Sequence, residues 1–265
     1  MRNPPRKTAF VLAASEHGTM IVNRLDYRMV DQARGIGVGF QILDNGAYDA
    51  PEVDTVLSLL ALRLQYFGTG VVAIDCGANI GVHTIEWAKR MTGWGRVIAI
   101  EAQERVFYAL AGNITINNCF NARAVHAAVA ATPGTMRVPS PDYLKPASFG
   151  SLELRPREGV EFIGQPIDYS EQMAAEIRTV TIDAFDLARI DLIKIDVEGM
   201  ELEALAGASA SLARCHPVLV VESLKTDKAR LRSFIEQLGY RVFEMGLNLL
   251  AIHETDKTLT HVKAP

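Results

Sequence analysis

A glycine-containing loop headed by an acidic residue is the strongest candidate for a ligand site. The segment "DCGANIGVHT", Asp75 to Thr84, follows a continuous apolar run and precedes a helical pattern. Gly77 and Gly81 allow a tight turn and a close approach of the backbone to a ligand. The loop lacks the three glycines of a dinucleotide loop, and its leading carboxylate would repel phosphate but suits a cationic amino group. The alternative is a glycine turn that binds nothing.

A second carboxylate stands where it could complete that site. Glu101 ends the next apolar strand, "RVIAIE", 26 residues after Asp75. A carboxylate at this point can accept hydrogen bonds from both hydroxyls of a ribose. Taken alone, a glutamate after a strand is an ordinary solvated residue, and the pair does not by itself exclude a nicotinamide cofactor. Gln103 and residues 127–129 could frame a purine ring or simply pack in the core.

The segment "DLIKIDVEGMELEAL", which starts at Asp191, places charged groups at the end of another apolar strand. Alternation puts Lys194 and Asp196 on one strand face, with Glu198 just beyond in the turn. A lysine inside an apolar parallel strand is costly unless a carboxylate or a cavity receives it. The trio therefore either serves an active site, with Asp196 or Glu198 as a base and Lys194 orienting, or is a buried ion pair that only supports the fold.

Several other polar residues have weaker patterns. Glu222 ends the fifth apolar strand and could face the same cleft. His83, at the start of a helix, could face a bound ligand, but a capping or surface position is expected more often there. His126 is expected to be a core histidine. No cluster of histidines and carboxylates has a metal-ligand spacing, so we expect no metal site.

The elements that carry these residues alternate between strands and helices from Val71 onward. Helical patterns cover 83–91, 106–117, 201–212 and 227–238, and apolar runs such as 97–101, 123–130, 191–196 and 217–222 lie between them. This alternation predicts a buried, mostly parallel, doubly wound sheet. Residues 240–243 and 248–252 are separated only by a short turn, so this final pair is expected to be an antiparallel hairpin.

The chain is expected to have two parts. Residues 1–67 form an N-terminal extension, with short strands at 10–14 and 19–23 and a helix at 52–67, packed on a main domain of residues 68–265. The stretch 132–179 is irregular. Long loops in compact domains are often functional, but a plain surface excursion fits equally well.

Composition narrows the possible partners. A net charge of −4 predicts no general affinity for nucleic acid. No apolar run reaches the roughly 18 residues of a membrane span, and the short run near the N-terminus is weak for an export signal. The three cysteines have no paired spacing, so we expect a cytoplasmic protein with free thiols.

The three motifs, in this order and spacing, resemble the FkbM-type methyltransferases. "GAYDAPEVDTVLSLL", "RTVTIDAF" and "PVLVVES" are also similar, so the resemblance spans about residues 40 to 252. It implies a Rossmann-like class I methyltransferase fold and S-adenosylmethionine-dependent O-methylation of a sugar or secondary-metabolite hydroxyl. The partner would be a small-molecule or carbohydrate acceptor. The excursion at 132–179 matches no pattern of the family, which leaves the acceptor open.

The resemblance also assigns roles to residues. It implies a cofactor loop and ribose ligand formed by Asp75, Gly77, Asn79, Gly81 and Glu101. It places an active-site motif at Lys194, Asp196, Glu198 and Gly199. The alternatives are a protein that binds the cofactor without turnover and a nicotinamide-dependent oxidoreductase. The second would require the dinucleotide glycine pattern, which is absent.

Overall fold

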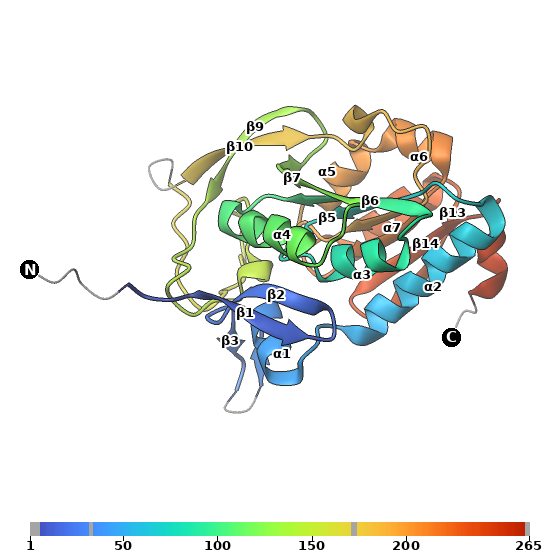
Figure 1. The fold of residues 1–265 in the computed structure, drawn as a ribbon. Coiled ribbons are helices and arrows are strands. Elements are labelled where there is room, and N and C mark those ends of the chain that lie inside the picture. The colour runs from blue at the N-terminus through green and yellow to red at the C-terminus, as the bar shows by residue number, and fades with distance from the viewer. Residues whose placement is uncertain (1–5, 32–33, 171–173, 263–265) are drawn as a thin grey trace, which may run out of the picture.

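A seven-stranded sheet forms the centre of the structure, a computed structural model that describes residues 6–31, 34–170 and 174–262 (Figure 1). Its strand order is β13-β14-β12-β11-β5-β6-β7. The bounds are β5 Val71–Cys76, β6 Gly95–Glu101, β7 Ala122–His126, β11 Leu192–Ile195, β12 Val218–Glu222, β13 Tyr240–Met245 and β14 Asn248–His253. Neighbouring strands pair in parallel except at β14, which is antiparallel to both β12 and β13. The predicted Rossmann-like sheet and its antiparallel hairpin are confirmed.

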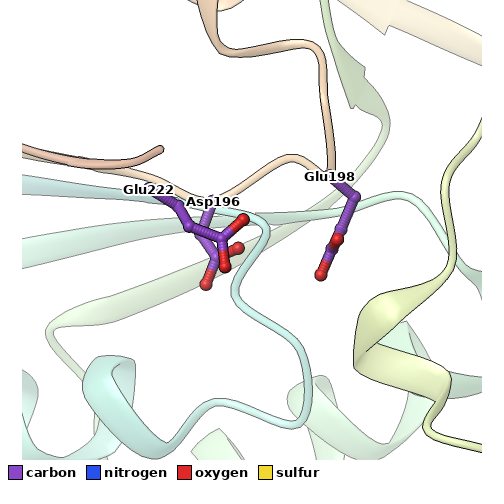
Figure 2. Close-up of side chains that lie close together, drawn as sticks. All are labelled: Asp196, Glu198 and Glu222. Atoms are coloured by element: carbon purple, nitrogen blue, oxygen red, sulfur yellow. The ribbon is translucent and has the colours of Figure 1, made fainter. Parts of the chain in front are cut away.

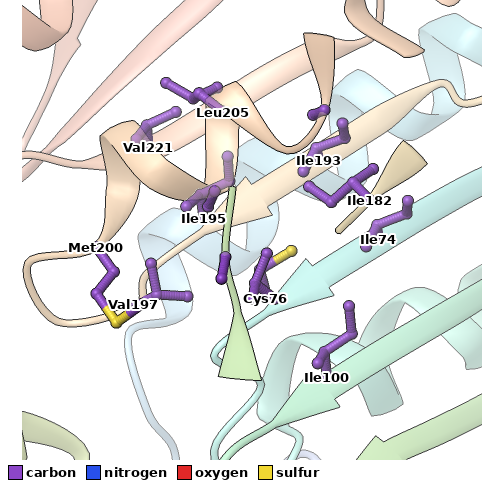
Figure 3. Packing of buried hydrophobic residues seen from close by; sticks show 14 of the residues in the cluster. Ile74, Cys76, Ile100, Ile182, Ile193, Ile195, Val197, Met200, Leu205 and Val221 are labelled. Carbon is purple, nitrogen blue, oxygen red and sulfur yellow. The ribbon is translucent and has the colours of Figure 1, made fainter. Parts of the chain in front are cut away.

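Helices cover both faces of this sheet. On one face lie α2 Ala50–Phe67, α3 Val82–Arg90 and α4 Glu104–Ile116. On the other lie α5 Glu201–Ala206, α6 Ser209–Cys215 and α7 Lys228–Gln237, and Figure 3 shows part of the core beneath them. Every residue of β5 is buried, as its unbroken apolar run predicts for a central strand covered on both sides.

The predicted helix 201–212 is wrong in one respect, because the chain forms two short helices there. Gly207 separates them, and a Cβ at this position would lie 2.2 Å from the carbonyl oxygen of Ala130. The second helix begins anew where the carboxylate of Asp183 accepts hydrogen bonds from the backbone N–H groups of Ala210 and Ser211. Tight packing and a distant capping carboxylate thus override the helical periodicity.

The N-terminal residues pack against the main sheet's helices. β1 Phe10–Ser15 and β2 Gly18–Asn23 form the expected hairpin, followed by β3 Arg28–Met29 and β4 Gly35–Ile36. A short helix, α1 Val38–Asn45, was not predicted. The side chain of Asn113 on α4 joins the hairpin to the glycine-containing loop at 75–84, called the first loop below. It accepts a hydrogen bond from the Ile21 N–H at 2.6 Å and donates one to the Ile80 carbonyl at 2.8 Å.

The irregular stretch contains a small second sheet. The predicted strand 123–130 is divided in two, because only β7 stays in the central sheet. β8 Ala128–Val129 instead pairs with β10 Ala174–Val180, which also pairs with β9 Gly134–Pro139. The 3-10 turns are η1 Phe149–Ser151, η2 Asp183–Phe185 and η3 Lys257–His261. No helix among the described residues is both long and apolar enough to cross a membrane.

A buried carboxylate fastens this stretch to the N-terminal residues. Asp26 accepts hydrogen bonds from the backbone N–H of Gly39 at one oxygen and from that of Phe149 at the other, both at 2.9 Å. Burial raises its pKa to about 6, although these hydrogen bonds oppose the shift. The two segments therefore form one continuous wall beside the sheet.

Candidate functional site

A cavity of about 350 Å³ opens at the carboxyl ends of the parallel strands. It lies over the ends of β5, β6, β11 and β12, where open α/β sheets bind ligands. Of the nine sequence-predicted site residues, seven line it: Asp75, Gly77, Asn79, Glu101, Lys194, Asp196 and Glu198. Gly81, at the start of α3, and Gly199, in the turn after β11, do not line the cavity.

The two loop glycines are explained by packing within the protein. Gly77 has φ +77°, and a Cβ there would lie 1.7 Å from the carbonyl oxygen of Asp196. Gly81 has φ +93°, and a Cβ would lie 2.6 Å from Leu110 Cδ1. The Gly77 position therefore lets the first loop lie directly against the end of β11. This contact brings the two predicted motifs together.

Asp75 presents one carboxylate oxygen without a partner. Its side chain is 1% exposed, and Oδ2 accepts a hydrogen bond from Thr84 Oγ1 at 2.6 Å. Oδ1 has no hydrogen-bond partner among the described residues, although it is buried. An unsatisfied buried oxygen in the wall of a cavity is a place where a ligand's ammonium or N–H group fits.

Glu101 is held in place by backbone N–H groups. Its two oxygens accept from the N–H of Asn79 at 2.9 Å and from that of Gln103 at 2.7 Å. Burial raises its pKa to about 7, although these hydrogen bonds favour the charged form. A carboxylate oxygen has two lone pairs, so each oxygen can still accept a hydroxyl donor. Gln103 and residues 127–129 line the same cavity.

Lys194 and Asp196 are in direct contact at the end of β11. Lys194 Nζ donates to Asp196 Oδ2 at 2.8 Å, and β11 pairs Lys194 with Asp75 across the sheet. Burial alone would lower the pKa of Lys194, but the carboxylates of Asp196, Asp75 and Glu52 together hold it above its ordinary value. The ammonium therefore stays charged among carboxylates.

Glu198 projects from a strained turn after β11. It adopts φ +56° and is followed by Gly199 at φ +97°. Glu201 Oε1 fixes this turn by accepting from the backbone N–H groups of Val197 at 3.2 Å and Gly199 at 3.0 Å. A non-glycine residue in the left-handed region is uncommon and is retained where the surroundings enforce it, often at functional sites.

Three carboxylates converge at this end of the cavity. Figure 2 shows Asp196 and Glu222 side by side, with Glu198 facing the same space from its turn. One oxygen of each lies within 4.8 Å of the others, a spacing that one divalent cation could bridge. Burial and the charge of Asp196 raise the pKa of Glu222 to about 8 and raise that of Glu198. Two lysines already balance part of this charge, Lys194 on Asp196 and Lys225 on Glu198.

His83 differs from its prediction as a capping or surface residue. Its side chain is buried and lines the cavity, with Nε2 3.3 Å from Glu52 Oε1. His126 is half-buried and stacks on the ring of Phe107, while its Nε2 lies 3.1 Å from the carbonyl oxygen of Ala102. Its contacts are therefore with neighbouring protein groups, as expected for a histidine in the core.

Sequence reasoning missed the walls of the cavity. The N-terminal residues contribute Ile36, Gly37, Val38, Gln41 and Tyr48, and the irregular stretch contributes Ser148, Gly150, Ser151, Leu152, Leu154 and Glu161. Leu224 and Leu247, both more than half exposed, also line the cavity. Tyr48 belongs to the segment "GAYDAPEVDTVLSLL", but no role was predicted for it, and only the long irregular stretch indicated a functional wall.

Over nearly two thirds of its length the chain is similar to known methyltransferases. A family model described as a methyltransferase FkbM domain matches residues 75–242. Methyltransferase sdnD from Sordaria araneosa is 24% identical over 190 residues, which cover 64% of this chain and 73% of that protein.

Two solved methyltransferases also resemble this chain. A methyltransferase FkbM from Methylobacillus flagellatus KT gives a TM-score of 0.48 at 20% identity, covering 81% of this chain and 58% of that one. A tRNA (uracil-54, C5)-methyltransferase from Pyrococcus abyssi, in complex with S-adenosyl-L-homocysteine, gives 0.45 at 12% identity, covering 92% of this chain and 44% of that one. The chain thus spans only about half the length of these two solved proteins.

Proposed function

The chain belongs to the methyltransferase FkbM domain family, and on that premise we propose that it transfers a methyl group from S-adenosylmethionine to a hydroxyl of a small-molecule or carbohydrate acceptor. The observation that carries the proposal is that the cofactor-loop residues and the carboxylates after β11 line one cavity. The cofactor would be held at one end and the acceptor hydroxyl at the other.

The residues at the cofactor end fit S-adenosylmethionine. Glu101 would accept the ribose hydroxyls with the lone pairs that its backbone donors leave free. The free oxygen of Asp75 would accept from the ammonium of the methionine moiety. When bound, S-adenosylmethionine supplies an electrophilic methyl group on a sulfonium sulfur. Lys194, which pairs with Asp75 in the sheet, donates a hydrogen bond to Asp196 and so links the two groups of residues.

The carboxylates after β11 would handle the proton of the acceptor. When the hydroxyl oxygen takes the methyl group, the methyl–sulfur bond would break and S-adenosylhomocysteine would be released. The hydroxyl proton would pass to a base, and Asp196 or Glu198 could accept it. Burial and the neighbouring carboxylates raise the pKa of Glu198, and a carboxylate with a raised pKa is a stronger base than an exposed one, which favours Glu198. Alignment of the acceptor between the base and the methyl group supplies much of the remaining acceleration.

The charge of the cavity favours a neutral acceptor. Among the described lining residues, six carboxylates accompany one ammonium: Asp75, Glu101, Glu161, Asp196, Glu198 and Glu222 against Lys194. Burial keeps part of Glu101 and Glu222 protonated near neutral pH, and Lys225 and Arg28 pair with Glu161. The remaining carboxylates would still repel a phosphate or carboxylate on the acceptor. Leu224 and Leu247, exposed beside the carboxylates, would contact apolar parts of the acceptor.

A turnover assay with matched variants tests the proposal. S-adenosylhomocysteine formation is measured with a panel of neutral glycosides and hydroxylated secondary metabolites, each paired with its phosphorylated form. Asp196→Asn or Glu198→Gln should lower the single-turnover rate by about 10²–10⁴ with little change in S-adenosylhomocysteine affinity. The control is Glu203→Gln, whose exposed carboxylate pairs with Arg155 away from the cavity.

The outcomes separate catalysis from a purely structural role. If the lysine–carboxylate pair only supports the fold, Asp196→Asn lowers the melting temperature and leaves the rate per folded molecule intact. If no acceptor supports turnover although S-adenosylhomocysteine binds tightly, the chain is a cofactor-binding protein and the enzymatic proposal fails.

A further inference from the structure

Lys225, in the loop after β12, is surrounded by three oxygen atoms. Its side chain is 4% exposed, and Nζ lies 2.5 Å from Glu198 Oε2, 3.0 Å from Glu161 Oε2 and 2.8 Å from the Ser151 carbonyl oxygen. Lys225 donates a hydrogen bond to the Ser151 carbonyl and forms ion pairs with the two glutamates. A buried ammonium held by three oxygen atoms from separate segments is restricted in position.

The partners of Lys225 come from two separate parts of the chain. Glu198 belongs to the turn after β11, whereas Ser151 and Glu161 belong to the irregular stretch that forms one wall of the cavity. Glu161 also pairs with Arg28, so the contact extends to the N-terminal residues. The lysine therefore joins the candidate base to the wall that faces it.

The direction of the Glu198 side chain depends on this contact. Glu201 fixes the backbone of the turn through Val197 and Gly199, but it does not touch the Glu198 carboxylate in any hydrogen bond described. Glu198 Oε2 is buried, and Lys225 is its ion-pair partner. We propose that Lys225 is a positioning residue for methyl transfer, which aims the Glu198 carboxylate into the cavity, favours its charged form and fastens the wall at 149–161 over it. This inference rests on the proposed role of Glu198 as the base.

The charges around Glu198 define what the lysine must do. Asp196 on its own loop and Glu222 at the end of β12 both raise the pKa of Glu198, in addition to burial. Lys225 opposes them, and its own charge is maintained by Glu198 and by Glu161 from the wall. Without the ammonium, three carboxylates would face one another with only Lys194 nearby, and Glu198 would hold its proton to a higher pH.

The experiment compares Lys225→Met with Lys225→Arg and with Lys228→Met, whose exposed ammonium pairs with Glu244 on the protein surface. The carboxyl carbon of Glu198 is followed by ¹³C NMR titration in protein labelled on glutamate, and its signal is assigned with Glu198→Gln. In Lys225→Met the titration midpoint should rise by about one pH unit or more, the usual effect of losing a close opposite charge. Lys225→Arg and Lys228→Met should leave it near the wild-type value.

Hydrogen exchange provides the second measurement. Amides at residues 149–152 should exchange at least tenfold faster in Lys225→Met and at the wild-type rate in Lys228→Met. If Lys225→Met does not fold, Lys225→Gln, which removes the charge but keeps a donor, is titrated in its place. An unchanged Glu198 midpoint in a folded, charge-neutral variant overturns the inference.

Neither measurement uses an acceptor or turnover. The proposed function and the proposed role of Lys225 can therefore fail separately. If Glu198→Gln retains the wild-type turnover rate, Glu198 is not the base, and Lys225 is then not a positioning residue for the reaction even if the titration shifts. If Glu198→Gln is inactive but its midpoint is independent of Lys225, the proposed function stands and the inference about Lys225 is wrong.

Discussion

Lowering the pH from 8 to 6 should weaken the binding of S-adenosylhomocysteine about tenfold through Glu101 alone. The pKa of this carboxyl is about 7 in the free protein because the side chain is buried. Its two oxygens already accept from the backbone N–H groups of Asn79 and Gln103, and ribose hydroxyls would add donors to the charged form. The carboxyl must therefore lose its proton before the ligand's hydroxyls can bind fully.

The magnitude follows from the fraction of Glu101 that is ionised. With a pKa of about 7, roughly nine tenths of the molecules are ionised at pH 8 and one tenth at pH 6. If only the ionised form accepts both hydroxyls, the affinity differs by about a factor of ten, or about 1.4 kcal/mol. The direction of the effect follows from linkage. The affinity for S-adenosylhomocysteine is highest above the pKa of Glu101 in the ligand-free protein, and it decreases as the pH falls through that value.

Calorimetric titration at pH 6, 7 and 8 measures this effect. Repeating each titration in two buffers of different ionisation enthalpy counts the protons, and close to one proton should be released on binding at pH 6. Glu101→Gln should bind more weakly at pH 8, and its affinity should change much less between pH 6 and 8. This control is required because Glu222, with a pKa of about 8, also lines the cavity. Equal pH dependence in wild type and Glu101→Gln would refute the ribose assignment.

Three further predictions concern the fold and the site. Gly77→Ala should destabilise the protein by about 2–4 kcal/mol, because its Cβ would overlap the Asp196 carbonyl oxygen. The control, Gly93→Ala, has φ +83° but open space around it and should cost only about 1 kcal/mol, as measured for both variants by urea denaturation. Asp26 has a pKa of about 6 in the folded protein, above its usual value, so its protonation stabilises the fold at low pH and this contribution is lost as the pH rises from about 4 to 6. The free energy of unfolding of Asp26→Asn, relative to wild type, should therefore increase by roughly 2–3 kcal/mol between pH 4 and 7. A difference that stays constant with pH would contradict the burial argument. EDTA should leave turnover unchanged, because lysine ammonium groups already neutralise Asp196 and Glu198; loss of activity that added Mg²⁺ or Mn²⁺ restores would instead assign a cation to the three carboxylates.

The parallel sheet and the position of its charged residues were accessible from the sequence. Buried parallel strands are continuous apolar runs, and their carboxyl ends meet at one edge of the sheet. For this reason Asp75 and Glu101, 26 residues apart, could be expected to lie close to Lys194. The antiparallel end followed equally from a connection too short for a crossover.

The remaining features depend on contacts between distant segments. The helix break at Gly207 is set by the Ala130 carbonyl, which no local pattern indicates. His83 is buried because α2 brings Glu52 against it, so a position at a helix start was not sufficient to predict exposure. Lys225 lies in an ordinary polar loop in the sequence. Its importance is visible only once the irregular stretch folds back over the strand ends.

The tightly packed first loop also changes how its glycines are understood. From the sequence, Gly77 and Gly81 were expected to allow a tight turn and a close approach to a ligand, whereas in the structure the carbonyl of Asp196 requires glycine at position 77. The two interpretations are compatible, since the loop packed against β11 places Asn79 and Glu101 in the same cavity as the carboxylates that follow β11.

A crystal structure with S-adenosylhomocysteine bound tests the central claim most directly. The account predicts that the ribose hydroxyls lie within about 2.5–3.2 Å of the Glu101 oxygens and the amino group near Asp75 Oδ1. The sulfur should then face the space between Asp196, Glu198 and Glu222. A ligand bound outside this cavity, or one whose sulfur faces away from these three carboxylates, would contradict it.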